Sequence, residues 1–414
     1  MDPPTSSFCD DFFVPLSDYS SAISEGHVET LDLLLSEMKE EKKKVEQLHH
    51  QDQELERELD YWKEHCMELQ DELLEWKATH KNRFSIHSLK DSASKLSSLL
   101  GVPSYEEFTE FVDEVYWAGN LGWGELDRYD QVAAALIHLR TGSTWVFLSL
   151  LFFSSAKKEP NLCRIGIRAL SYIERDLYTK HVFYPPPAAI TVKTLCELLA
   201  DLPGCYAFVD GTYLYGENSQ SASLHQEMYC HYKNSLQLTK FLVVCDPVGF
   251  IMGIYGPCSS TSDDVLFKNI VTHAKEISEG ERDDDDLGCG KMLWSWLSSL
   301  PQGASLVFDA GFPSIEKVLP VNVMLPTKPR KGEEVFEASD AVKSRKVTKW
   351  RGVIERVNRR LKVFHLLSVR FPNSSLINCE LFFRVSAILG NRFGQTLTKL
   401  AEDEDKTFKK YFEE

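Results

Sequence analysis

Apolar residues recur at helical spacing along residues 27–78. With Leu31 taken as the first heptad position, twelve of the fourteen seam positions are apolar. The seam comprises Leu31, Leu34, Met38, Glu41, Val45, Leu48, Asp52, Leu55, Leu59, Trp62, Cys66, Leu69, Leu73 and Trp76. Because no Pro or Gly interrupts the pattern, it predicts one long helix that pairs as a coiled coil, and so a homodimer. A solvated single helix is the alternative, and the orientation of the paired strands stays open.

The pattern elsewhere divides the chain further. Residues 1–26 are acidic and rich in Ser, Asp and Pro, so we expect them to be disordered. Residues 79–102 read as a polar linker with a short helix, and residues 396–414 as an acidic tail. Residues 103–200 show helical spacing. A turn at 141–143 separates two of these helices, as in a helix-turn-helix, although ordinary helical packing explains the pattern equally well.

Short apolar runs rich in β-branched and aromatic residues replace the helical spacing from residue 205. Asp246-Pro247-Val248-Gly249 predicts a hairpin turn between two of them. Helices are expected at 263–277, 291–299, 341–368 and 375–391. The mixture predicts an α/β domain over residues 201–395, with a mixed sheet flanked by helices.

Four acidic residues stand in settings that suit a metal-binding carboxylate. Asp210 and Asp309 each follow a short apolar run and are expected to close a buried strand, Asp263 follows a Ser/Thr loop, and Glu355 lies on a basic helix. Carboxylates gathered from distant elements repel one another unless a cation holds them, and Mg²⁺ or Mn²⁺ prefers such oxygen ligands. Two such ions can clamp the attacking and leaving oxygens of a phosphodiester.

Three of the four acids also have a purely structural explanation. Asp210-Gly211 is a common turn dipeptide. Ser262 or Asp263 is a good helix N-cap, and the neighbouring Asp264 leaves open which of the two carboxylates points inward. Glu355 has arginines four residues to either side, so ordinary ion pairs along the helix would account for it.

Charge is unevenly distributed along the chain. The formal net charge is −16, yet residues 328–370 carry thirteen Lys or Arg against five Asp or Glu. A basic patch can therefore exist on an acidic protein, and it would contact DNA phosphates without reading sequence. The expected phosphate contacts are Arg345, Lys346, Lys349, Arg351, Arg356, Arg359, Arg360 and Lys362.

Cysteine usage and apolar run lengths bear on the compartment. The ten cysteines form no C-x-x-C pair and no zinc-type spacing, which predicts free thiols in a reducing compartment. The apolar run 145–153 is too short to span a membrane, and the first residues lack signal-peptide features. We expect a soluble intracellular protein with no membrane contact. The segments "KPRK" and "KSRKVTKWR" are compatible with nuclear import, so we expect the nucleus, with the cytoplasm as a second compartment.

Six ordered blocks resemble a known family. They are "VDGTYL", "SLHQEMYCHYKNSLQLTKFLVVCDPVGFI", "SSTSDDVLF", "LVFDAGFP", "RGVIERVNRRLKVFHLL" and "AILGNRF". Over roughly residues 125–395 the chain is similar to the DDE superfamily endonucleases of PIF/Harbinger-type transposases and their domesticated relatives. The resemblance implies an RNase H-like fold over residues 201–395, with Asp210, Asp263, Asp309 and Glu355 as ligands of Mg²⁺ or Mn²⁺.

The function that this resemblance implies is divalent-metal-dependent cleavage of DNA, with strand transfer as a further step. Asp210, Asp309 and Glu355 would be the catalytic set, and Asp263 would assist or act from an outer shell. In Harbinger-type systems a separate Myb-like protein can supply target recognition. The alternative is a catalytically inactive, transposase-derived factor that binds DNA or protein and dimerises through its coiled coil.

Overall fold

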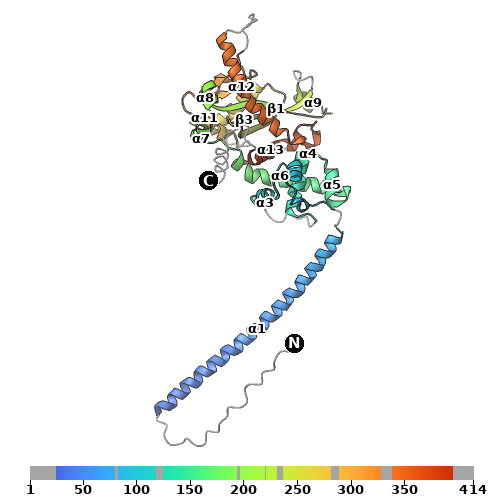
Figure 1. The fold of residues 1–414 in the computed structure, drawn as a ribbon, viewed down its shortest axis with the longest axis vertical. Helices are drawn as coiled ribbons and strands as arrows, with labels where there is room; N and C mark the ends of the chain where they lie inside the picture. Colours follow the sequence, from blue (N-terminus) through green and yellow to red (C-terminus); the bar gives the residue numbers. More distant parts are fainter. Residues whose placement is uncertain are drawn as a thin grey trace. The chain divides into compact units, whose positions relative to one another are not determined.

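The computed structural model divides into two compact units, residues 1–81 and 82–414 (Figure 1). No helix among its described residues is long and apolar enough to cross a membrane. The expected disordered N-terminus lies outside these residues except for its last two positions, and the acidic tail lies outside them altogether. The described residues are 25–79, 83–117, 125–193, 196–219, 221–230, 236–280, 289–327 and 338–394.

The first unit contains one uninterrupted helix, α1 (Glu25–Thr79), which is 55 residues long. The heptad pattern predicts this helix almost to the residue. Its apolar seam is exposed in the single chain, as at Met38, Val45, Leu48 and Leu55. Pairing of the helix stays a prediction.

The second unit begins with a helical layer in which α4 is buried along most of its length. Gly142 ends α4 in the left-handed region at φ 69°, and Thr144 caps the next helix by accepting a hydrogen bond from Phe147 N. The turn at 141–143 is therefore where the sequence places it. The elements are the 3₁₀ turn η1 (Ile86–Leu89), α2 (Ala93–Leu100), α3 (Tyr105–Asp113), α4 (Arg128–Thr141), α5 (Trp145–Phe153), η2 (Ala156–Lys158) and α6 (Glu159–His181).

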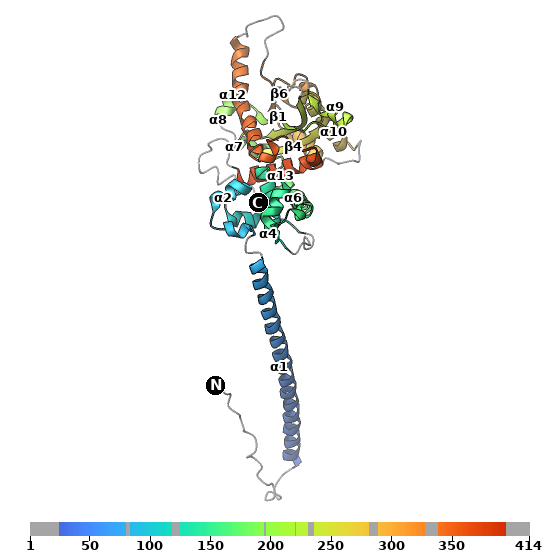
Figure 2. The ribbon, with the colours of Figure 1, turned by 90° about the vertical axis from the view of Figure 1, so that its right-hand side faces the viewer.

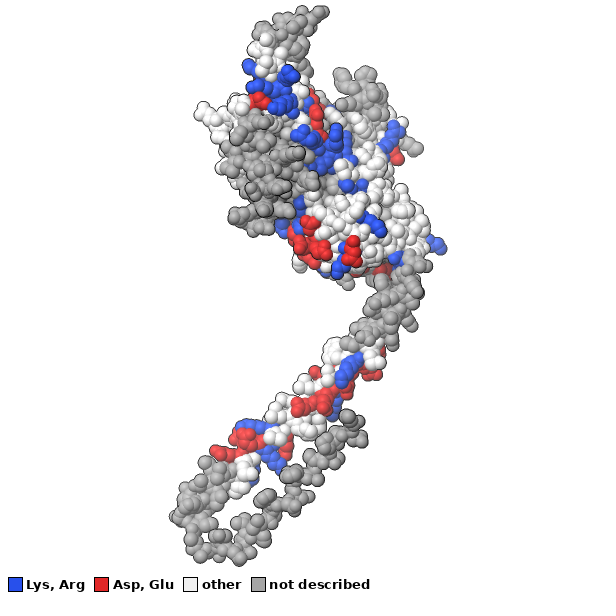
Figure 3. Space-filling view, viewed as in Figure 1, with Lys and Arg blue, Asp and Glu red and all other residues white. Residues whose placement is uncertain are grey.

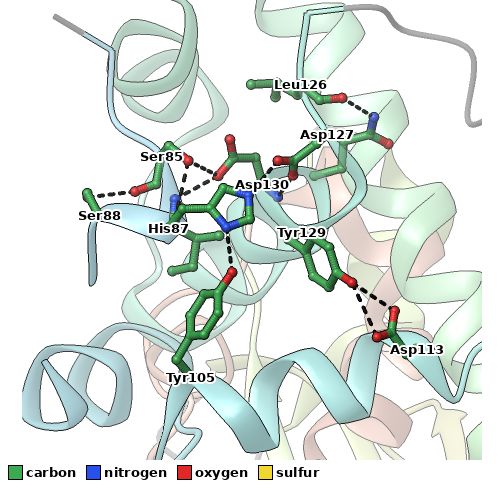
Figure 4. A network of polar contacts seen from close by, with 11 residues as sticks. Ser85, His87, Ser88, Tyr105, Asp113, Leu126, Asp127, Tyr129 and Asp130 are labelled. Atoms are coloured by element: carbon green, nitrogen blue, oxygen red, sulfur yellow. Dashed lines mark hydrogen bonds and ion pairs between the residues drawn. The ribbon is translucent and has the colours of Figure 1, made fainter. Parts of the chain in front are cut away.

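Polar contacts tie η1 to the start of α4 (Figure 4). Asp130 accepts hydrogen bonds from Ile86 N at 2.7 Å and Ser85 Oγ at 3.1 Å. Nearby, the His87 ring contacts Asp127 Oδ2 at 2.5 Å. Burial raises the pKa of Asp130 to about 6, although the bond from Ile86 N opposes this shift and the charge of Asp127 adds to it.

A mixed sheet forms the centre of the second unit, in the order β2-β3-β1-β5-β6, with β4 also paired to β3. β1 is antiparallel to β3 and parallel to β5. The predicted hairpin between β3 and β4 is confirmed, and Asp246 Oδ1 accepts from Val248 N and Phe250 N within the turn. The strands are β1 (Cys205–Tyr215), β2 (Tyr229–Cys230), β3 (Leu236–Cys245), β4 (Ile251–Cys258), β5 (Ser305–Val307) and β6 (Asn322–Met324).

Helices cover this sheet, and α13 also joins it to the helical layer. α12 packs on β1 and β3, while α13 packs on both β4 and α6 (Figures 1 and 2). One apolar core therefore runs through the whole second unit. The helices are α7 (Pro187–Lys193), α8 (Cys196–Asp201), α9 (Ala222–Met228), α10 (Asp263–Ser278), α11 (Cys289–Ser299), η3 (Ile315–Lys317), α12 (Ala338–Leu361), η4 (His365–Leu367), η5 (Asn373–Asn378) and α13 (Cys379–Phe393).

Two helix boundaries differ from the prediction. The helix expected over 341–368 ends at Leu361, because the chain turns there to bury Phe364, Leu366 and Leu367. The helix expected from residue 375 starts at Cys379, because a 3₁₀ stretch follows Pro372.

Candidate active site

Asp210 lies in the middle of β1, opposite Val243 of β3. The expectation that it closes its strand is therefore wrong. Gly211 to Tyr215 continue the ladder with β3, since the alternating run after Asp210 is itself strand-forming. The side chain is 15% exposed. Burial raises the pKa of Asp210 to about 6, the charge of Arg351 opposes this shift, and the charge of Asp309 adds to it.

Asp309 follows the end of β5 by two residues, so it lies just beyond the strand that the sequence expects it to close. Because β5 is the parallel neighbour of β1, this strand end lies beside Asp210. Gly311 N donates a hydrogen bond of 2.7 Å to Asp309 Oδ1. The side chain is 43% exposed.

Glu355 lies on α12, which packs on the sheet through buried Val353, Ile354 and Val357. At 61% its side chain is the most exposed of the four acids. It forms the i,i+4 ion pair with Arg351 that the sequence allows.

Arg351 joins three of the four acids. Its Nη2 lies 3.7 Å from Asp210 Oδ2 and 3.5 Å from Asp309 Oδ2, and its Nη1 lies 3.4 Å from Glu355 Oε1. Its side chain is 14% exposed. Carboxylates from β1, the β5 end and α12 therefore converge on one guanidinium.

Asp263 is the first residue of α10, and its carboxylate lies against Gly211. A Cβ at position 211 would stand 3.0 Å from both Cγ and Oδ2 of Asp263. Tyr213 OH donates to Asp263 Oδ2 at 2.9 Å, and the buried Lys240 Nζ donates to Oδ1 at 3.0 Å. Asp263 therefore lies against Gly211, which follows Asp210 in the chain, and Lys240 balances the charge of the Asp263 carboxylate.

Asp264 contacts Ser314 and Lys268 instead of β1. It accepts hydrogen bonds from Ser314 Oγ at 2.7 Å and Ser314 N at 3.0 Å, and it pairs with Lys268 at 2.9 Å. Burial raises its pKa, but these partners outweigh burial and leave the pKa below its usual value. Ser262 accepts from Val265 N and is the N-cap of α10. The geometry therefore separates Asp263, which faces β1, from Asp264.

The predicted phosphate contacts fall into two groups along α12. Arg345, Lys349, Arg356 and Arg359 are exposed, and Figure 3 shows Lys and Arg side chains gathered over this part of the surface. Lys346 and Lys362 are half-buried. Lys346 and Lys349 pair with Asp201 of α8.

Two arginines of that set point inward instead. Arg351 faces the three acids described above. Arg360 donates to Gly390 O at 3.1 Å, and burial lowers its pKa. These two side chains pack within the unit rather than presenting themselves to a phosphate on its surface.

The sequence did not single out three further polar residues of the site. Asn358 Nδ2 donates to Asp210 Oδ2 at 3.1 Å, and Lys240 and Tyr213 hold Asp263. The spacing of Arg351, Glu355 and Asn358 along α12 is three and four residues, which places them on one helix face and is a usable signal. No comparable signal links Lys240 to Asp263, because that contact depends on how α10 meets the sheet.

The donor set suits a hard divalent cation. In the parts of the chain that the structure describes, no three His, Cys, Asp or Glu side chains are grouped closely enough to hold a metal ion as they stand. A guanidinium instead lies among three of the acids as a stand-in cation. The buried Asn358 Oδ1 next to them lacks a hydrogen-bond partner among the described residues and adds an oxygen donor.

Comparison with known proteins gives a match to a protein family, whereas no curated protein and no solved structure matches the chain. The match starts one residue before Asp210 and ends within α13, so it contains all four acids as well as Arg351 and Asn358. Residues 209–391 match the family described as DDE superfamily endonuclease, which suggests nuclease or transposase-like activity for this part of the chain.

Proposed function

We propose that the chain is a divalent-metal-dependent DNA endonuclease of the PIF/Harbinger type, with an RNase H-like catalytic domain. The convergence of Asp210, Asp309 and Glu355 on one cation carries this proposal. The family match supports it, since a nuclease domain implies DNA as substrate. The sheet supports the fold, because antiparallel β4, β3 and β1 continue into parallel β5 and β6 with helices packed against them.

Asp210, Asp309 and Glu355 would hold Mg²⁺ or Mn²⁺, with Asp263 in an outer position. When bound, such ions activate the attacking water, or the attacking DNA 3′-hydroxyl in strand transfer, and stabilise the leaving oxygen. The strand pairing of β1 and β5 fixes the spacing of the two aspartates. Asn358 orients Asp210, and Lys240 with Tyr213 holds the Asp263 carboxylate in place.

The exposed basic residues of α12 would hold the DNA backbone. Arg345, Lys349, Arg356 and Arg359 lie on the helix that carries Glu355, so a strand bound there passes the acids. Contacts to phosphates carry no sequence information. A separate Myb-like protein would supply target recognition, and the protein would act in the nucleus.

The exposed seam of α1 would pair two copies of the chain. A stripe of apolar side chains that includes Leu48, Leu55, Leu59 and Trp62 is costly to leave in water along a single helix. A homodimer covers it and supplies two catalytic units, as cleavage at two DNA ends requires.

Nicking of a supercoiled plasmid tests the catalytic proposal. Wild type should nick with Mg²⁺ or Mn²⁺ and not with EDTA, and Asp309→Asn should lower the rate by more than about a hundredfold while DNA binding survives. Asp340→Asn, on α12 away from the three acids, is the charge-matched control and should nick like wild type. Equal nicking by Asp309→Asn would refute the mechanism. Thermal stabilisation by Mn²⁺ without nicking would instead favour the inactive binding factor.

A further inference from the structure

One cation already occupies the centre of the acidic cluster. The Arg351 guanidinium lies 3.4–3.7 Å from oxygens of Asp210, Asp309 and Glu355. We propose that Arg351 is a built-in counter-ion of the metal-free site, and that a divalent cation binds in exchange for it.

The need for a counter-ion follows from burial. Asp210 is 15% exposed and lies near Asp309, so two negative charges meet where little water screens them. Asn358 donates one hydrogen bond to Asp210, but an uncharged amide does not balance the negative charge of the carboxylate. A planar guanidinium can face several carboxylates at once, and Arg351 does so from the i−4 position on the helix of Glu355.

The arginine is also held loosely enough to leave. Charge-assisted hydrogen bonds between nitrogen and carboxylate are about 2.7–2.9 Å long, and each of the three ion pairs is longer. Within the described part of the chain, the buried Nε of Arg351 has no hydrogen-bond partner. The guanidinium therefore balances charge without the two-pronged bonding that fixes a structural arginine.

Metal ligation and this arrangement exclude each other. Mg²⁺ lies about 2.0–2.1 Å from its oxygen ligands and draws them together around itself. The guanidinium contacts Asp210 and Asp309 through Oδ2 of each, and it would have to withdraw from these oxygens. The displaced Arg351 keeps its charge and becomes available to the phosphate that the same site is proposed to cleave.

Because this inference rests on the proposed function, its test measures metal affinity in the absence of DNA. Arg351→Gln removes the charge and keeps an amide. An arginine beside a carboxylate lowers the affinity of that carboxylate for a proton by about 10-fold to 1,000-fold, and it should act on Mn²⁺ in the same sense. We expect Arg351→Gln to bind Mn²⁺ at least about tenfold more tightly than wild type by calorimetry near pH 8. Arg168→Gln, an exposed arginine on α6, is the matched control and should bind like wild type.

The outcomes separate the two claims. Equal or weaker Mn²⁺ binding by Arg351→Gln overturns the exchange but leaves the metal site standing. Absence of Mn²⁺ binding in both wild type and Arg351→Gln overturns the metal site and the exchange together. Binding only after the substitution supports the exchange most strongly.

A second measurement needs no variant, in case Arg351→Gln does not fold. Phenylglyoxal modifies accessible guanidinium groups, and mass spectrometry can report the extent at Arg351 in wild type. Mn²⁺ should raise the modification of this side chain, which is 14% exposed without metal, by severalfold, and leave Arg168 unchanged. No change at Arg351 with Mn²⁺ bound would overturn the exchange.

Discussion

The four acids differ in how far water reaches them. The exposed fraction of the side chain is 15% for Asp210, 20% for Asp263, 43% for Asp309 and 61% for Glu355. Asp210 and Asp263, the two least exposed acids, therefore depend on close neighbours, and the backbone of Gly211 lies against the Asp263 carboxylate. Residue-scale effects on stability should be concentrated there.

Gly211→Ala tests this closeness. The new Cβ would lie 3.0 Å from the Asp263 carboxylate, which Lys240 and Tyr213 hold in place, so the variant should lose about 1–3 kcal/mol of unfolding free energy. Gly352→Ala is the contrasting variant, because its Cβ would meet only the flexible end of Arg356 and the change favours α12. Urea denaturation should show loss for the first and none for the second. Equal effects would mean that Asp263 does not lie against β1.

Asp130 makes the stability of the second unit depend on pH. Its folded pKa of about 6 lies above the usual value of 3.8, so the folded state binds the proton more tightly than the unfolded state. The contribution of Asp130 to the free energy of unfolding is fully present at low pH. It is lost as pH rises from about 4 through about 6, and the total loss is on the order of 1–3 kcal/mol. Asp130→Asn should lack that loss. The facing groups Asp127 and His87 are present in both proteins, so the difference between their stability–pH curves reports on Asp130, and parallel curves would contradict the assignment.

Elements differ in how much of them the sequence predicts. The uninterrupted heptads predict α1, and the Asp-Pro-Val-Gly turn predicts the β3–β4 hairpin, because both depend on local spacing. The local pattern does not predict the end of α12 at Leu361, because burial of the residues that follow sets this end.

In the candidate active site, too, the sequence predicts the features that depend on local spacing and not those that depend on tertiary packing. The apolar run before Asp309 is a local feature, and it predicts the position of this acid to within two residues of the strand end. The sequence predicts Arg351 as a partner of Glu355 and as a phosphate contact, but not its approach to Asp210 and Asp309, because that approach depends on the packing of α12 against β1. The pairing of Lys240 with Asp263 likewise arises from tertiary structure and leaves no mark in the sequence pattern.

The charges beside the α1 seam predict its orientation. In a parallel pair, Glu37 faces Lys42 of the other copy and Glu58 faces Lys63, whereas a fully overlapped antiparallel pair places Lys42 against Lys63. We therefore expect a parallel homodimer. Lys42→Glu with Lys63→Glu should weaken dimerisation severalfold in sedimentation experiments, and adding Glu37→Lys and Glu58→Lys should restore it. An antiparallel pair would show neither the loss nor the rescue.

The whole molecule is acidic, with a net charge of −16, yet its basic side chains gather over α12 (Figure 3). DNA binding should therefore be local to this surface and strongly dependent on salt. Arg356→Gln should weaken binding about equally for different DNA sequences, and it should reduce the slope of log affinity against log salt by about 1. Arg168→Gln should leave the slope unchanged. A sequence-dependent loss in Arg356→Gln would assign base reading to α12.

The position of the metal tests the central claim most directly. Anomalous scattering from crystals of the full chain grown with Mn²⁺ locates the ion without reference to activity. The account predicts a peak bonded to oxygens of Asp210 and Asp309, close to Glu355, with Arg351 withdrawn from both aspartates. Mn²⁺ bound elsewhere, or these acids still paired with Arg351 at saturating Mn²⁺, would contradict it.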